Sequence, residues 1–261
     1  MGLFKYFREQ RRLNTVKDHP IPDADWNAVI TTLSIFSSLS QNDLSRLRNL
    51  STVFLFEKRF LPLQGTVLDS RTKTKIAAEA CLPILGLDLD WYSDWKTIIV
   101  VPDAYEITRS EMDSSGVIHE YQDELSGEVL HLGPIVLSLT DVERSGLGDG
   151  YNVVIHEAAH KIDGKDGDFD GCPPLPEELS YEDWRKAFSE AYERSRNRRV
   201  AKRKRHSPRI DEYAEFSPDE FFAVCVESFF ETPVILRSDF PSVYALLVRF
   251  FKQDSFERLS R

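Results

Sequence analysis

The feature that most constrains this chain is a polar motif, His-Glu-Ala-Ala-His at residues 156–160, inside the otherwise apolar segment 151–162. The valines, isoleucines and alanines around the motif predict a buried helix that stops near Gly164. Histidines four residues apart on a helix lie about 40° from each other around its axis, on nearly the same face. Polar groups on a buried helix need partners, and a metal ion is one such partner.

The motif predicts a zinc site. Neutral imidazoles are good zinc ligands, so His156 and His160 are predicted to bind one Zn²⁺. Glu157 lies one position further round the helix, where its carboxylate can reach a metal-bound water without ligating the metal. This arrangement predicts hydrolysis with Glu157 as general base. The alternative is a chance occurrence of the motif, expected on the order of once in a hundred chains of this length.

Two histidines leave a third ligand to be found. A metzincin continuation requires Gly and His where this chain has Asp163 and Asp166, so that class is excluded. A glutamate shortly downstream, as in thermolysin-like enzymes, has only the near misses Glu177, Glu178 and Glu182.

Glu220 is a better candidate, because it opens the apolar segment 220–227 and would face the core beneath the motif helix. The alternative is an ordinary glutamate in a first helical turn, with Ser217 as N-cap and Pro218 at the first position. The residues alone leave both interpretations open.

The hydrophobic pattern along the chain predicts an α+β fold with its strands gathered before the motif helix. Residues 23–39 and 41–50 carry helical stripes, so we expect residues 1–55 to form a helical segment packed on a catalytic domain of residues 56–261. After segment 52–60 we expect a helix at 71–85, a buried strand at 97–102, a hairpin of 116–121 and 128–132 around Ser126-Gly127, a strand at 133–139, and helices at 181–194, 218–230 and 244–251.

Composition limits the partners and the compartment. A net charge of -10 and a pI near 5.2 argue against a protein devoted to nucleic acid or to an anionic membrane. The three widely spaced cysteines fit buried thiols in a reducing compartment, and no signal peptide or membrane span is visible, so the expected location is the cytoplasm.

Two further patterns compete with the motif. Residues 166–177 match the EF-hand calcium formula, but three prolines in the second half favour a turn-rich acidic loop. Residues 194–209 are rich in Lys and Arg without an acidic residue, and we interpret them as a solvated helix end and loop. The basic stretch has no aromatic residue for base stacking, so no direct nucleic-acid contact is expected.

Several segments together resemble the Mlc titration factor A family of metallopeptidases over about residues 55–235. They are DWYSDWKTIIVVPDAY, GPIVLSLTDV, NVVIHEAAHKID and SPDEFFAVCVESFF. More distantly, the HExxH and EFFA motifs, with Tyr213 seven residues before Glu220, are similar to the catalytic domain of anthrax lethal factor.

The resemblance implies a role for each matching residue. His156, His160 and Glu220 would be the zinc ligands, Glu157 the general base, and Tyr213 a hydrogen-bond donor to the developing oxyanion. Glu227 and Asp163 are candidates for orienting the metal ligands without binding the metal themselves. The implied fold is a zincin with a mixed sheet, in which the strand at 133–139 lines the cleft. Its residues Gly133, Pro134, Ile135 and Val136 would pair with an extended peptide substrate.

The resemblance also implies an activity and a partner. Members of the family have been assigned aminopeptidase-type activity, and the founding member binds the glucose-responsive repressor Mlc. We therefore expect a zinc peptidase that binds a peptide or protein substrate and a repressor of the Mlc type. The competing hypothesis is a non-enzymatic module that sequesters a transcription factor and keeps only a structural or vestigial zinc site.

Overall fold

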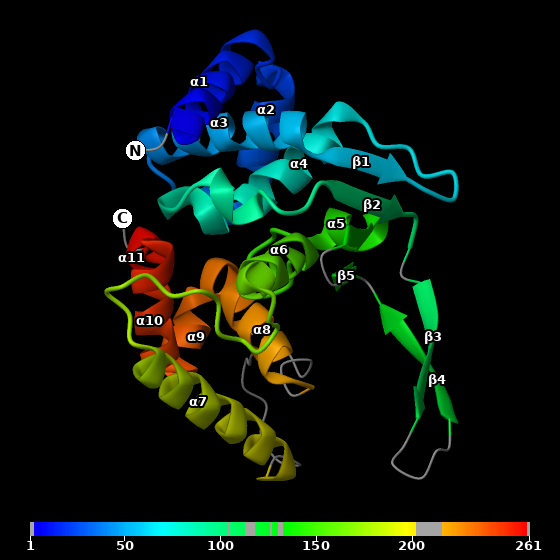
Figure 1. The fold of residues 1–261 in the computed structure, drawn as a ribbon, viewed down its shortest axis with the longest axis vertical. Helices are drawn as coiled ribbons and strands as arrows, with labels where there is room; N and C mark the ends of the chain where they lie inside the picture. Colours follow the sequence, from blue (N-terminus) through cyan, green and yellow to red (C-terminus); the bar gives the residue numbers. More distant parts are fainter. Residues whose placement is uncertain are drawn as a thin grey trace.

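The computed structural model describes residues 3–103, 105–112, 118–125, 127–129, 133–201 and 216–259. Figure 1 shows the N-terminal helices at one end of the molecule and helix α7 (Tyr181–Ala201) at the other, with helix α6 (Val153–Asp163) between them. In the part of the chain that is described, no helix is both long enough and apolar enough to cross a membrane.

The expected helical start of the chain is confirmed. It contains α1 (Leu3–Asp18), α2 (Asp23–Thr32) and α3 (Gln41–Glu57), and the helix expected at 71–85 follows after the first strand as α4 (Ser70–Cys81). Ser40 caps α3 by accepting a hydrogen bond from the main-chain N–H of Asp43 at 3.1 Å. Helix α3 is longer than its stripe at 41–50 indicates, so the expected boundary at residue 55 falls inside it. The apolar residues of α2 and α3 join the same buried cluster as the rest of the chain.

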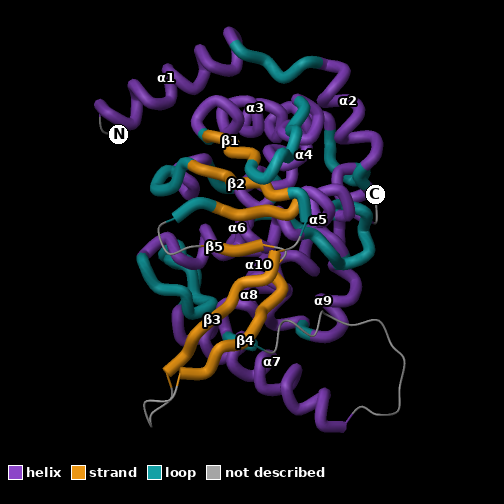
Figure 2. Tube along the Cα trace, turned by 90° about the vertical axis from the view of Figure 1, so that its right-hand side faces the viewer, coloured by secondary structure: helices purple, strands orange, loops and turns teal. Residues whose placement is uncertain are grey.

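A four-stranded mixed sheet follows in the order β1-β2-β6-β5. Its strands are β1 (Arg59–Pro62), β2 (Thr97–Val101), β5 (Gly127–Val129) and β6 (Ile135–Ser138). Strands β1, β2 and β6 are parallel, with Ile98 beside Ile135, whereas β5 is antiparallel to β6. Figure 2 shows the strands of this sheet one below the other, from β1 to β5. All four residues of β6 are buried, as a β-branched interior strand requires.

The expected hairpin around Ser126-Gly127 is wrong. Strand β4 (Ile118–Leu125) instead pairs with β3 (Tyr105–Met112), with Met112 opposite Ile118, and β5 pairs with β6. Strands β4 and β5 therefore belong to different sheets and do not form one hairpin. Figure 1 shows the β3–β4 pair extending away from the helices.

The C-terminal half is helical. Besides α6 and α7 it contains α5 (Leu139–Arg144), α8 (Pro218–Glu231), α9 (Pro233–Asp239), α10 (Pro241–Phe251) and α11 (Ser255–Leu259). The described residues also contain short 3₁₀ helices at Ser34–Phe36, Pro83–Gly86, Leu89–Tyr92 and Gly164–Asp166.

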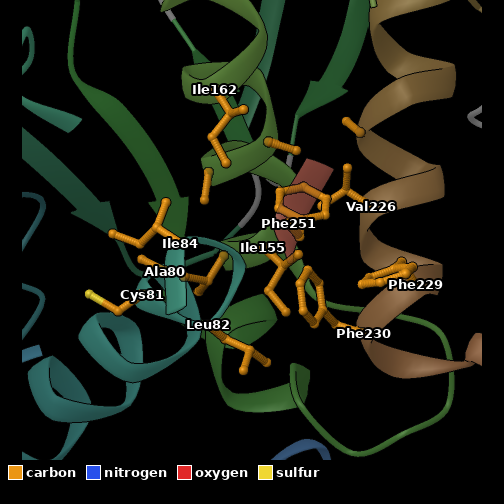
Figure 3. Close-up of a cluster of buried hydrophobic side chains, with 14 of the residues drawn as sticks. Ala80, Cys81, Leu82, Ile84, Ile155, Ile162, Val226, Phe229, Phe230 and Phe251 are labelled. Carbon is orange, nitrogen blue, oxygen red and sulfur yellow. The ribbon is translucent and has the colours of Figure 1, made fainter. Parts of the chain in front are cut away.

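The core lies where α4, α6, α8 and α10 meet. Figure 3 shows Ile155 and Ile162 of α6 among side chains of the other helices, with Phe229 and Phe230 of α8 and Phe251 of α10 around them. Ile155, Ile162, Phe229 and Phe251 are completely buried. Each buried aromatic or branched side chain contributes about 1.5–3 kcal/mol of transfer free energy, so this packing holds α6 against α8.

Candidate metal centre

The side chains predicted as metal ligands converge where α6 packs on α8. Nε2 of His156 lies 3.1 Å from Oε2 of Glu220 and 3.3 Å from Nε2 of His160. Nε2 of His160 lies 3.5 Å from the same Glu220 oxygen. Among the described residues, this is the one group of His, Cys, Asp or Glu side chains close enough together to hold a metal ion.

Local sequence explains how both helices present these groups. Asn152 caps α6, because its Oδ1 accepts the main-chain N–H of Ile155 at 3.0 Å. Pro218 occupies the first turn of α8, where its missing N–H costs nothing, and Glu220 follows in the same turn. Apolar residues on the inner faces of α6 and α8 pack together, and this packing brings His156 and His160 of α6 next to Glu220 of α8.

The electrostatics of the triad favour a positive charge beside Glu220. Burial lowers the pKa of His156, but hydrogen bonds with Glu220 and Glu227 outweigh burial and hold that pKa well above its ordinary value. Burial raises the pKa of Glu220, whereas its hydrogen bonds with His156 and His160 hold that pKa well below its ordinary range. A protonated imidazole or a metal cation satisfies this carboxylate.

Glu157 lies beside the triad on α6 and is only 3% exposed. Its Oε2 atom is buried and has no hydrogen-bond partner among the described residues. Burial raises the pKa of Glu157 to about 7, although the neighbouring His160 and His156 oppose the rise. A buried carboxylate oxygen without a partner is unfavourable unless another group, such as water or a substrate, meets it.

Glu227 and Asp163, the two residues expected to orient the ligands, have different contacts. Oε2 of Glu227 lies 3.4 Å from Nδ1 of His156, and its other oxygen accepts the main-chain N–H of Asn152. Oδ2 of Asp163 accepts the main-chain N–H of Gly171 at 3.0 Å, while Oδ1 is buried without a partner in the described part of the chain. Burial raises the pKa of Asp163 to about 7.

The sheet limits how residues 133–136 could meet an extended substrate, and their role in substrate binding stays a prediction. Ile135 lies between Ile98 of β2 and Val129 of β5, and Val136 has strand neighbours on both sides as well. Gly133 precedes the strand, and its carbonyl accepts a hydrogen bond from Nζ of Lys161 at 2.8 Å. Pro134 connects Gly133 to strand β6. An interior strand has no main-chain groups left for another strand, so the outer strand on this side is β5.

Tyr213, expected to donate to the oxyanion, lies outside the described residues, as does the second half of the basic stretch 194–209, from residue 202 on; α7 includes the first half, up to Ala201. The acidic loop at 166–177 is described. There, carboxylates of Asp166 and Asp170 accept main-chain N–H groups two residues ahead, at 3.4 Å and 3.0 Å, which is typical of Asx turns.

Sequence reasoning missed three polar residues behind the triad. Nδ2 of Asn152 donates to Oε1 of Glu79 on α4 at 3.2 Å and to Oε1 of Glu231 on α8 at 2.9 Å. Asn152 could be predicted from sequence as the N-cap of α6, because asparagine is a favoured N-cap residue. Glu231 stands four residues after Glu227 on the same helix. Glu79 is 73 positions from Asn152, and nothing in its local sequence indicates the contact.

Two imidazoles and a carboxylate are a ligand set that metal-dependent peptidases use, and the described residues bring one such set together next to buried Glu157. The chain belongs to the family described as glucose-regulated metallo-peptidase M90, whose model matches residues 7–252. It is 33% identical over 240 residues to Mlc titration factor A of Escherichia coli O139:H28 (strain E24377A), with 90% of this chain and 88% of that protein covered. The proteins of the same name from Escherichia coli O17:K52:H18 (strain UMN026) and Shigella sonnei (strain Ss046) are 34% and 33% identical over 238 residues, with the same coverage. The family resemblance of the motifs is thereby confirmed.

Proposed function

We propose that this chain is a zinc-dependent peptidase in which His156, His160 and Glu220 bind Zn²⁺. The observation that carries the proposal is the spacing of the ligand atoms, 3.1, 3.3 and 3.5 Å from one another. A tetrahedral ion with bonds of about 2.0–2.1 Å separates its ligands by about 3.3 Å. Three protein ligands leave a fourth position for water or substrate, as catalytic zinc sites require.

Glu157 is the proposed general base. Bound zinc would supply a Lewis acid that polarises a peptide carbonyl and makes a water molecule easier to deprotonate. The unpartnered Oε2 of Glu157 supports its role as the proton acceptor in that step. A carboxylate whose pKa is raised to about 7 can take a proton from water and return it to the leaving amine.

Glu227 and Asp163 are proposed to hold the ligand helix in place. The contact between Glu227 and Nδ1 of His156 would keep Nε2 directed at the metal. The contact between Asp163 and Gly171 would fix the chain that leaves α6 after His160. Both carboxylates are buried, so they keep a constant orientation.

The substrate would lie along the outer edge of β5, because an edge strand offers main-chain groups to an extended peptide and β6 does not. From the family resemblance, we assign Tyr213 the donation of a hydrogen bond to the oxyanion, a contribution that can be about 3 kcal/mol. Aminopeptidase-type cleavage is the reaction that the same resemblance favours.

Metal analysis by mass spectrometry, combined with a peptide-library digest, tests the proposal. We expect one zinc per wild-type chain together with cleavage of peptides. Glu157→Gln should keep zinc and lose turnover by about 10²–10⁴-fold, whereas His156→Ala should lose both. An active, zinc-replete Glu157→Gln protein would refute the role of Glu157, and wild type without a bound metal would refute the site.

A second function, binding of a transcriptional repressor, is favoured by the name of the relatives, Mlc titration factor A. In that case peptide cleavage would be incidental, and Glu157→Gln would bind an Mlc-type repressor as tightly as wild type and reproduce its cellular effect. Loss of the cellular effect in Glu157→Gln, with binding retained, would instead favour catalysis. Either function fits the predicted cytoplasmic location, which is supported by the unpaired, buried thiols of Cys81, Cys172 and Cys225.

A further inference from the structure

Asn152 is the centre of a buried polar network that the proposed chemistry does not use. It is fully buried and stands four residues before His156. Its Oδ1 caps α6, whereas its Nδ2 donates to carboxylates from two other helices, Glu79 of α4 and Glu231 of α8. One side chain thus joins three helices at the N-terminal end of the helix that carries the predicted ligands.

The main chain of Asn152 is connected to His156 through Glu227. The N–H of Asn152 donates to Oε1 of Glu227, and Oε2 of the same carboxylate lies 3.4 Å from Nδ1 of His156. The hydrogen bond at Oε1 limits how the carboxylate of Glu227 can turn. The position of the Asn152 N–H therefore influences how Oε2 meets the imidazole.

The loop that leads into α6 is held by the same network. Oε2 of Glu231 accepts the main-chain N–H of Gly148 at 2.6 Å. A Cβ atom at Gly146 would come within 2.6 Å of Oε1 of Glu79, so the loop passes directly against that carboxylate. Oγ of Ser145 accepts the N–H of Val153 at 3.1 Å, which ties the loop to the first turn of α6.

Capping a helix does not by itself require this arrangement. Serine, threonine or aspartate supply the same oxygen, but none has an NH₂ group that can donate to two carboxylates. Both carboxylates that accept hydrogen bonds from Nδ2 are buried, since Glu79 is 0% exposed and Glu231 is 6% exposed. Burial raises the pKa of Glu79 to about 8 and that of Glu231 to about 7, so burial disfavours the charged form of both carboxylates. Departures from an apolar core of this kind are expected chiefly at functional sites.

We propose that Asn152 is a positioning residue, held between Glu79 and Glu231, which sets the orientation of the Glu227–His156 pair toward the metal. The inference rests on the proposed zinc site. It adds that α4, in the N-terminal half of the chain, takes part in shaping that site although it contributes no ligand to it.

Asn152→Ser is the primary test, because it keeps an oxygen for the cap and removes the amide donor. The variant should fold, as judged by circular dichroism and thermal unfolding. Its dissociation constant for zinc, measured by chelator competition, should rise about 10–100-fold. The visible absorption bands of the cobalt-substituted protein should shift, because the orientation of His156 changes. Glu231→Gln should change both readouts in the same direction, because its NH₂ group must face one of two donors, the N–H of Gly148 or Nδ2 of Asn152.

Tyr244→Phe is the matched control. It removes two part-buried hydrogen bonds outside the network, one donated to Oδ1 of Asp254 and one accepted from the main-chain N–H of Phe256. We expect it to lower the unfolding temperature while zinc affinity stays within twofold of wild type and the cobalt bands stay unchanged. An equal loss of zinc affinity in this control would attribute the effect to general destabilisation and overturn the inference.

The outcomes separate the inference from the function on which it rests. Wild type that binds neither zinc nor cobalt would overturn both. Wild type that binds metal, with unchanged affinity and bands in Asn152→Ser and Glu231→Gln, would overturn only the positioning role. If Asn152→Ser does not fold, Glu231→Gln decides by the same two measurements.

Discussion

Glu227 meets His156 at the ring nitrogen that points away from the other ligands, with Oε2 3.4 Å from Nδ1. Nε2 of the same ring faces Glu220 at 3.1 Å. A histidine that donates its Nδ1–H to a carboxylate is held in the tautomer whose Nε2 can bind a metal. The pair therefore joins the buried polar network to the predicted metal ligands.

Glu227→Gln is expected to weaken zinc binding about 10–100-fold, because an amide N–H can then face Nδ1 of His156 and disfavour the required tautomer. Chelator competition measures the change. Glu182→Gln, at an exposed position of α7, is the control and should bind zinc like wild type. Equal affinity in Glu227→Gln and wild type would show that the contact does not orient the ligand.

Zinc is expected to stabilise the folded chain through His156, His160 and Glu220. At a free concentration of about 1,000 times the dissociation constant, one site adds about 4 kcal/mol. Differential scanning fluorimetry should show a lower unfolding temperature after chelation and its recovery with added zinc. His160→Ala should remove this zinc-dependent difference; a variant that keeps it would place the stabilising metal elsewhere.

Gly171→Ala is expected to destabilise the protein by roughly 3 kcal/mol or more, since Gly171 has φ +78° and an added Cβ would lie 2.5 Å from the carbonyl oxygen of Pro218. That backbone begins α8, two residues before Glu220. Gly167→Ala, at φ +104° with no atom within 4 Å of the added Cβ, should cost only about 1–2 kcal/mol. Urea unfolding compares the two, and equal losses would show that the contact with Pro218 is unimportant.

Stability should fall as the pH rises through the titration of Glu79. Burial raises the pKa of Glu79 from 4.5 when exposed to about 8 in the folded chain. The folded state therefore binds the proton more tightly, and the stability present below about pH 4.5 is lost between pH 4.5 and 8. Glu79→Gln has no carboxyl group to titrate at this position, so it does not lose this stability. Its free energy of unfolding minus that of wild type should therefore rise by on the order of a few kcal/mol from pH 5 to pH 8. A pH-independent difference in denaturant unfolding would contradict the raised pKa.

Local patterns predicted the elements that carry the candidate site. The HEAAH motif lies on a helix because its apolar neighbours repeat with helical period, and Glu220 opens α8 after Ser217 and Pro218. The hairpin at 116–132 was misassigned, because a turn signal says where the chain bends and not which strand lies beside it. In the same way, no local pattern in residues 133–136 indicates that β6 lies between β2 and β5, which decides whether its main-chain groups can pair with a substrate.

The chemical groups, their order and the helical faces on which they lie can be deduced from the amino-acid sequence, because these depend on contacts within a few residues. Long-range packing alone brings Glu220 to His156 across 64 positions and Glu79 to Asn152 across 73. Such contacts form because the apolar faces of α4, α6 and α8 exclude water together, and the polar atoms carried inside must then bond to one another. No local pattern specifies which buried carboxylate meets which donor.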